Sequence, residues 1–338
     1  MSKEYFLIIF FIVNILLIIF FKFTKLLLDN PTHGKHKNEF YRGIPLTGGC
    51  YFLICSVLIF FSEENSIIYM PYFIFFSLVF ILGIFSDTYK NMSPMLRLII
   101  QVAIVVGAVC ILKINVDKTS LNLLDFLISN RYINIFFTSF CLLVLLNGSN
   151  FCDGINLNVI GYYLIVFIAL NFLDINNSDA DILILIISCL LIFYITNFLN
   201  FAFLGDNGVY VLSLFSGIYV INFINSEQYL NPLIALNLLW YPAYENLFSI
   251  IRRKIKRNKI DHADTKHLHF LVKNYLSKKI NILKDVNSLT GLIFNLFNFI
   301  SIGAAILYRN NSYILLLILI INLIIYNFIY FKLKDNNL

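Results

Sequence analysis

Residues 147–158, with the sequence NGSNFCDGINLN, decide how the rest of the chain is interpreted. An almost wholly apolar run, 132–146, precedes them, and a second apolar run, 159–173, follows. Between these runs the segment places a carboxylate, several side-chain amides and two glycines. Carboxylate and amide oxygens are the ligands that hard cations prefer, and polar groups at a membrane face are usually functional. The segment therefore predicts a junction between two membrane spans that binds a cation and a phosphorylated ligand.

The composition indicates an integral membrane protein. The chain has 338 residues, of which 59% are hydrophobic and 13% are charged, and its mean hydropathy is +0.81. A soluble domain carries about 25% charged residues. The six cysteines form no CxxC pair, so neither a disulfide framework nor a zinc site is expected. Hydrophobicity alone leaves a transporter, a channel, an enzyme and a scaffold open.

The apolar segments predict an all-α polytopic membrane protein with about 10–11 transmembrane helices, in a single domain over residues 1–338. The first of them has no small-residue cleavage site after it and is interpreted as an uncleaved span. The candidate spans are 5–21, 44–61, 67–85, 95–112, 132–146, 159–173, 182–199, 208–224, 230–250, 291–308 and 312–331.

The distribution of basic residues predicts the orientation. If the N-terminus lies outside, most of the 25 Lys and Arg residues fall in cytoplasmic loops, as the positive-inside rule requires. The longest of these loops, 251–290, is basic and contains three histidines. Every polar cluster of the chain then lies on the cytoplasmic face. An enzyme that uses cytosolic substrates has a reason for this arrangement, and a scaffold has none.

The first inner loop contains candidate phosphate-binding residues. Lys35 and Arg42 precede the sequence IPLTGG at 44–49, whose glycines allow backbone N–H groups to approach a ligand closely. The alternative is a basic loop that contacts anionic lipid.

The second inner loop combines one carboxylate with two cations. Asp87 directly follows an apolar span, Lys90 is three residues further on, and Arg97 lies in the next helix. These side chains are interpreted as a group that faces an anionic ligand. The alternative is a solvated Asp–Lys pair, with Ser93 as a helix N-cap.

Two further inner loops provide candidate metal ligands. Asn150 and Asp153 are three residues apart, so a helical turn places them on one face. Asp206 lies between glycines in FLGDNG, 203–208, at the entrance to another span. We expect helix packing to bring Asp206 to Asn150 as a metal ligand. The alternatives are an ordinary Asn/Gly turn and an Asp helix cap.

The last inner loop opens with RRKIKR and continues to HLHF. His267 and His269 are two residues apart, which is not the spacing of a helical zinc pair. The basic run is equally consistent with a positive-inside signal and lipid contact. A loop of about forty residues is nevertheless long for a plain connection.

In their order along the chain, these loops resemble the polyprenyl-phosphate N-acetylhexosamine-1-phosphate transferases of glycosyltransferase family 4. The superfamily also contains the phospho-N-acetylmuramoyl-pentapeptide transferases. IPLTGG is similar to the loop after the family's first span, and GIFSDTYKNMSPMLRLIIQ to its acidic-pair motif. NGSNFCDGIN looks like NxxNxxDGxD, FLGDNG like FxGDxG, and HLHF like HxHH.

The resemblance implies roles for individual residues. Asp206 and Asn150 would bind Mg²⁺, with Mn²⁺ as an alternative, together with the pyrophosphate of a UDP-sugar. Asp153 would contact the nucleotide, and Asp87 would lie beside the polyprenyl phosphate, so that Asp87, Asp153 and Asp206 form the catalytic set. The implied substrate-binding residues are Lys35, Arg42, Lys90, Arg97, Asn147, Asn156, Arg252, Arg253, His267 and His269.

The implied reaction transfers a sugar-1-phosphate, with N-acetylhexosamine-1-phosphate preferred, from a UDP-sugar to undecaprenyl phosphate. It releases UMP and starts a cell-surface glycan such as lipopolysaccharide, at the bacterial plasma membrane. The alternatives are an enzyme of the phospho-N-acetylmuramoyl-pentapeptide transferase type and a transporter or binding protein for a lipid phosphate. The expected partners are the UDP-sugar, the lipid phosphate and membrane lipid, with a homodimer left open and no nucleic acid.

The chain departs from the family pattern at four places. Ser86 stands where the family usually has the first Asp of its pair, and Asn156 where many members have a second Asp. Phe270 replaces the last His, and Gly34 or its neighbours replace an Arg-containing pattern. These departures are interpreted as those of a subfamily with its own sugar.

Overall fold

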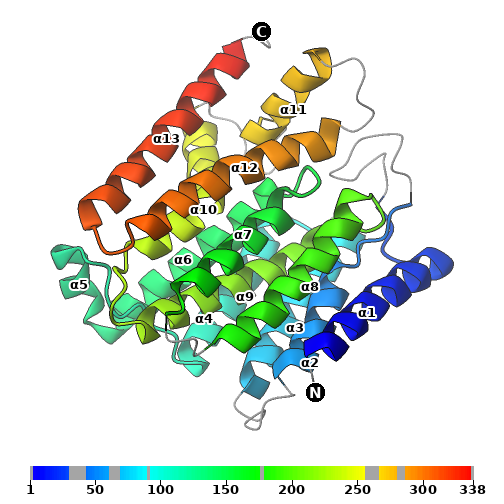
Figure 1. Ribbon diagram of the computed structural model, residues 1–338, viewed down its shortest axis with the longest axis horizontal. Coiled ribbons are helices and arrows are strands. Elements are labelled where there is room, and N and C mark those ends of the chain that lie inside the picture. The colour runs from blue at the N-terminus through cyan, green and yellow to red at the C-terminus, as the bar shows by residue number, and fades with distance from the viewer. Residues whose placement is uncertain are drawn as a thin grey trace.

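The computed structural model describes residues 3–29, 43–60, 69–89, 92–175, 179–255, 266–279 and 286–335. In these ranges the chain forms a bundle of thirteen helices, and its only β-structure is a pair of isolated bridges (Figure 1). The helices are α1 (Lys3–Thr24), α2 (Gly48–Phe60), α3 (Met70–Thr88), α4 (Pro94–Ile111), α5 (Asn122–Ile128), α6 (Arg131–Cys152), α7 (Asn158–Leu173), α8 (Ala180–Phe198), α9 (Gly205–Ser226), α10 (Ile234–Ile255), α11 (Leu268–Lys279), α12 (Val286–Leu307) and α13 (Ser312–Asp335).

The helices confirm the predicted polytopic membrane protein. Each of the predicted spans coincides with a helix, and the short helices α5 and α11 lie between spans. Eight of the described helices are long and apolar enough to cross a membrane: α1, α3, α4, α6, α8, α9, α12 and α13. The apolar helices α2 and α7 are shorter. At 1.5 Å per residue, the 16 residues of α7 extend about 24 Å, a little less than a hydrocarbon core.

The centre of the bundle is formed by α7 and α9, whose side chains are buried on nearly all sides. In contrast, α1 and α13 lie on opposite flanks of the bundle (Figure 1). Only a minority of the residues of these two helices are buried. The start of α1 and the end of α13 lie at opposite edges of the bundle. The N-terminus-outside orientation stays a prediction.

Helix boundaries differ from the predicted spans at the segment 147–158. α6 continues through Cys152, so that only 153–157 connect it to α7. The polar side chains are accommodated inside the helix: Asn147 Nδ2 donates to the Leu143 carbonyl at 3.0 Å, and Ser149 Oγ donates to the Leu145 carbonyl at 2.8 Å. Hydropathy ends a span at the first polar residue, whereas a helix ends only where its backbone bonding stops.

The N-terminus of α4 shows how local sequence sets the helix starts. Ser93 Oγ accepts a hydrogen bond from the Leu96 N–H at 3.1 Å, and Pro94 occupies the first helical position. Both residues suit these positions because a side-chain oxygen satisfies an otherwise unpaired N–H and proline has none to satisfy. The N-cap at Ser93, which belonged to the alternative interpretation of this loop, is present, and it fixes where Arg97 lies in the first turns of α4.

The packing of α3 on α9 depends on Gly83. A Cβ atom at this position would lie 2.3 Å from the Asn207 Cα and 2.6 Å from the Asn207 backbone N. Because the obstacle is backbone, α3 and α9 would have to separate. The start of α9, including Asp206, is therefore held by direct contact with α3.

We expect Gly83→Ala to lower the thermal unfolding midpoint, since overpacking costs about 1–3 kcal/mol. Gly303→Ala is the matched control, because a Cβ there meets no atom within 4 Å. The measurement is thermal unfolding of both variants in the same detergent. An unchanged midpoint for Gly83→Ala would contradict the close approach.

Candidate functional site

The start of α9 is attached to the segment that leads into α2. The Phe203 N–H donates to the Pro45 carbonyl at 2.9 Å, and Leu46 and Phe203 form a parallel bridge. The Gly49 N–H donates to Asn207 Oδ1 at 2.7 Å. IPLTGG was predicted to offer its backbone to a ligand. In the structure the Gly49 N–H instead binds a side chain of the FLGDNG segment, and the two motifs form one unit.

Asp87 caps α9 from the neighbouring helix. Its carboxylate accepts hydrogen bonds from the backbone N–H of Asp206 at 2.9 Å and of Asn207 at 3.1 Å. It also accepts one from Asn207 Nδ2 at 2.6 Å. The first N–H groups of a helix have no partner within that helix, and a carboxylate there also interacts favourably with the helix dipole. Asp87 therefore fixes the position of the first turn of α9.

Asp206 is buried between a hydroxyl and a guanidinium. Ser86 Oγ donates to Asp206 Oδ2 at 2.5 Å, and Arg97 contacts the same oxygen at 3.4 Å. Arg97 also donates to Ser86 Oγ at 3.1 Å. A serine at position 86 supplies a donor to Asp206, which an ionised aspartate cannot do. The departure from the family pattern thus has a local explanation.

Two of the predicted catalytic carboxylates and one predicted cation therefore come together. Asp87 and Asp206 lie at adjoining ends of α3 and α9, and Arg97 reaches Asp206 from α4. We call Ser86, Asp87, Arg97, Asp206 and Asn207 the acidic centre. The residues Lys35, Arg42 and Lys90, which were predicted to bind phosphate beside it, lie outside the described residues.

A second cluster surrounds His267, just before α11. His267 Nδ1 lies 2.8 Å from Glu245 Oε1, and Tyr326 OH donates to Glu245 Oε2 at 2.6 Å. Ser249 Oγ lies 3.3 Å from His267 Nδ1 and accepts a hydrogen bond from Arg252 at 3.3 Å. We call these five residues the histidine cluster.

Sequence reasoning missed Glu245, which is fully buried in α10. A detectable signal was present, because a lone carboxylate inside an otherwise apolar span usually marks a functional or structural partnership. The identity of the partners, on α13 and before α11, was not readable from the sequence.

The histidine cluster contacts the end of α6. The rings of Phe151 and His267 are 5.2 Å apart, and the Arg253 guanidinium lies 5.5 Å from the centroid of Phe151. The rings of His267 and His269 are nearly parallel at 5.7 Å. A Cβ at Gly154 would lie 2.7 Å from His269 Nε2 and 2.3 Å from Phe270. The segments NGSNFCDG and HLHF, more than a hundred residues apart, are therefore in direct contact.

The predicted roles of the amides differ in their structural support. Asn150 and the adjacent Asp153, at the end of α6, are both buried. Asn156 is also buried, where it donates to Asn200 and to the Asn197 carbonyl and accepts from Asn287 Nδ2 at 3.1 Å. These contacts give Asn156 a packing role between α8 and α12. Substrate contact by Asn147 or Asn156 stays a prediction.

The donor chemistry fits a hard cation. Asp153 and Asp206 offer carboxylate oxygens and Asn150 an amide oxygen, and all three side chains are buried. Among the described residues, no three His, Cys, Asp or Glu side chains are grouped as a complete metal site. Mg²⁺ does not require one, because it keeps several waters and binds one or two carboxylates together with substrate phosphates. The pairing of Asn150 with Asp206 stays a prediction.

Fold and site together define a polytopic membrane protein in which buried acidic, amide and histidine side chains gather at helix ends. Residues 69–224 match the model of glycosyl transferase family 4. The chain is also similar to a protein of Bacillus subtilis (strain 168) named probable undecaprenyl-phosphate N-acetylglucosaminyl 1-phosphate transferase. The two are 27% identical over 236 residues, which cover 65% of this chain and 62% of that relative.

These findings confirm the family resemblance drawn from the motifs. We call residues 69–224, the part of the chain that matches the family model, the family region. The region contains the acidic centre and the end of α6. The histidine cluster lies beyond it. The chain spans less than two thirds of the length of the relative it matches.

We expect Tyr326→Phe to destabilise the protein by about 1–3 kcal/mol, because it removes a donor from a buried carboxylate. Tyr313→Phe, on the same helix, is the control, since Tyr313 is largely exposed. The two variants are compared by denaturant or thermal unfolding in one detergent. Equal stabilities would show that the Tyr326–Glu245 contact contributes nothing.

Proposed function

We propose that the protein transfers a sugar-1-phosphate, preferably N-acetylhexosamine-1-phosphate, from a UDP-sugar to undecaprenyl phosphate and releases UMP. The observation that carries this proposal is the acidic centre, in which Asp87, Asp206 and Arg97 meet although they come from three helices. The centre lies within the family region, and the name of the similar Bacillus subtilis protein specifies a lipid phosphate acceptor.

The chemical problem in this reaction is electrostatic. The phosphate of the lipid attacks the β-phosphorus of the nucleotide sugar, so that one anion approaches another. A phosphate monoester has a second pKa of about 6, so it is mostly dianionic at neutral pH and needs no base. Arg97, at the edge of the centre, reduces the repulsion between the two anions. Mg²⁺, held by Asp206 and Asn150, would supply Lewis-acid neutralisation of the diphosphate.

The contacts of Asp87 support direct in-line attack rather than a phospho-aspartate at this residue. Both oxygens of its carboxylate accept hydrogen bonds from α9, three in total. A nucleophile in such surroundings would have to break these bonds and release the first turn of α9. We therefore propose that Asp87 positions Asp206 and that the lipid phosphate itself is the nucleophile.

We propose that the histidine cluster contributes the other half of the site. His267 and His269 contact the end of α6, which carries Asn150 and Asp153. Arg253 lies over Phe151 in the same region. The Arg253 guanidinium and the histidine rings suit the phosphate and sugar of the donor, with Asp153 toward the nucleotide. We further propose that this face is cytoplasmic, where nucleotide sugars are available.

The direct test incubates the purified protein with undecaprenyl phosphate, Mg²⁺ and a panel of UDP-sugars. We expect one UDP-N-acetylhexosamine to yield UMP and a lipid-linked product in equal amounts. UMP release also separates this function from lipid-phosphate transport, which produces none. A folded protein that forms no product with any sugar would overturn the proposal.

We expect Asp206→Asn to lower turnover by about 100-fold or more, as loss of a group that stabilises transition-state charge does. Asp117→Asn is the control, because Asp117 is exposed and remote from the acidic centre. Turnover is measured on protein of unchanged elution volume and unfolding midpoint. Near-normal turnover of Asp206→Asn would show that the cation is held elsewhere.

A further inference from the structure

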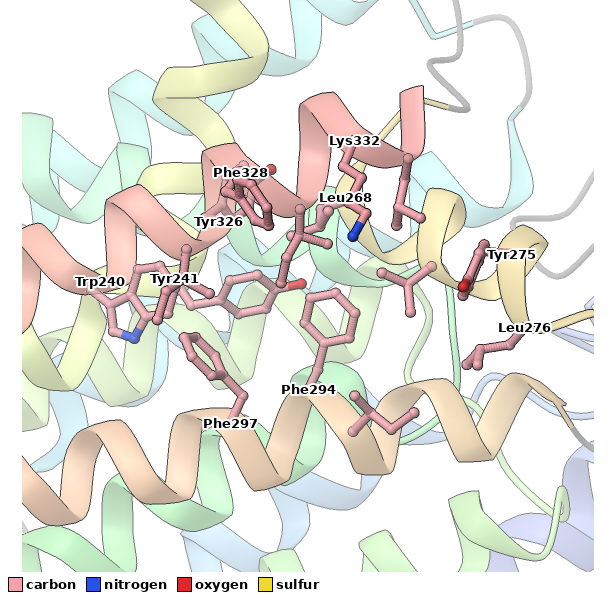
Figure 2. Close-up of a pocket in the computed structure, with 15 residues that line it drawn as sticks. Trp240, Tyr241, Leu268, Tyr275, Leu276, Phe294, Phe297, Tyr326, Phe328 and Lys332 are labelled. Carbon is pink, nitrogen blue, oxygen red and sulfur yellow. The ribbon is translucent and has the colours of Figure 1, made fainter. Parts of the chain in front are cut away.

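A cavity of about 470 Å³ lies between the last four helices, away from the acidic centre (Figure 2). All of its lining residues come from α10, α11, α12 and α13. Its volume is within the range of pockets that bind small molecules. Most of the wall is aromatic or aliphatic, and Figure 2 shows the side chains spread from Trp240 at one end to Tyr275 at the other. This shape suits an extended hydrocarbon chain.

Lys332 is the charged residue of the lining. Figure 2 shows its amino group directed from α13 toward the cavity, and the ammonium lies 5.7 Å from the ring of Phe328. The last turns of α11 and α13 also carry Lys278, Lys279 and Lys334. The chain that enters the cavity is therefore expected to bear an anionic group.

The position of α13 identifies the source of this chain. α13 is an outer helix with large exposed apolar side chains, among them Ile324 and Phe328, so it faces the bilayer. Phospholipids are in large excess there over any specialised lipid. The cavity wall includes no part of α3, α4 or α9, which carry Asp87, Arg97 and Asp206. The reactive lipid phosphate has to reach those helices, whereas a phospholipid does not.

We propose that this cavity binds an acyl chain of an anionic phospholipid whose phosphate is held by Lys332. The site does not depend on the proposed transferase activity. It borders the histidine cluster, because Leu268 and Tyr326 line the cavity and Tyr326 donates to Glu245, the partner of His267. The bound chain packs against both residues and stabilises the start of α11.

The single tryptophan of the chain allows the site to be tested directly, since Trp240 lines the cavity. The protein is placed in phosphatidylcholine nanodiscs that contain a minor fraction of brominated phosphatidylglycerol or, separately, brominated phosphatidylcholine. We expect stronger quenching of Trp240 fluorescence by the anionic lipid. Lys332→Gln lowers the apparent affinity for it about fivefold, the effect of one lysine at an anionic surface. Lys334→Gln, two residues away and absent from the cavity wall, leaves it unchanged.

A second comparison separates this cavity from another one that Trp240 also borders, which is lined mainly by α6, α9 and α10 and also by residues of α5 and α13. Val272→Phe narrows the proposed site, and Leu236→Phe narrows the other. We expect only Val272→Phe to reduce quenching. Equal quenching by the two brominated lipids, an unaltered lipid preference in Lys332→Gln, or loss of quenching in Leu236→Phe alone would overturn the proposal. Displacement of the brominated lipid by an equal amount of undecaprenyl phosphate would also overturn it, by assigning the cavity to the acceptor.

Discussion

The acidic centre depends on the hydrogen bonds from the first N–H groups of α9 to the Asp87 carboxylate. The first N–H groups of a helix have no partner within that helix, and a buried N–H left unpaired would cost about 1–3 kcal/mol. The Asp87 carboxylate accepts hydrogen bonds from these N–H groups and thereby determines where Asp206 lies. Ser86 and Arg97 then bind the Asp206 carboxylate, so one capping interaction organises side chains from three helices.

Small residues make this arrangement possible. Gly49, Gly83 and Gly208 each lie where a Cβ would approach another segment within 3 Å. In a membrane, the hydrophobic effect does little to hold one helix against another, so close backbone packing and interhelical hydrogen bonds take its place. The same glycines bring the motifs of α2, α3 and α9 within hydrogen-bonding distance. The close contacts that pack α2, α3 and α9 together therefore also assemble the acidic centre.

The sequence predicted the spans well because every backbone group in a bilayer must be paired within a helix, and a long apolar run has few other ways to fold. It also predicted that Asp87 and Asp206 meet, through the order of the motifs. It did not predict that Ser86 donates to Asp206, or that Glu245 joins His267 to Tyr326. Those pairs link distant helices, and no local pattern encodes which faces of two helices come together. The span that corresponds to α6 was predicted to end at residue 146, although the helix continues to Cys152. The polar side chains in its last turns donate hydrogen bonds to carbonyls of the same helix, so they do not end it.

Helix α13 lies on a flank of the bundle, yet it supports groups that are buried in the interior. α13 contributes Tyr326 to the buried Glu245 and covers the cavity beside α11. A protein shortened after α12 would retain every acidic motif of the family region. It would nevertheless lose the hydrogen bond from Tyr326 to Glu245 and the residues of α13 that line the cavity beside Leu268. The unit that holds the histidine cluster together therefore includes the final span, and a comparison limited to residues 69–224 would leave out a helix that supports His267.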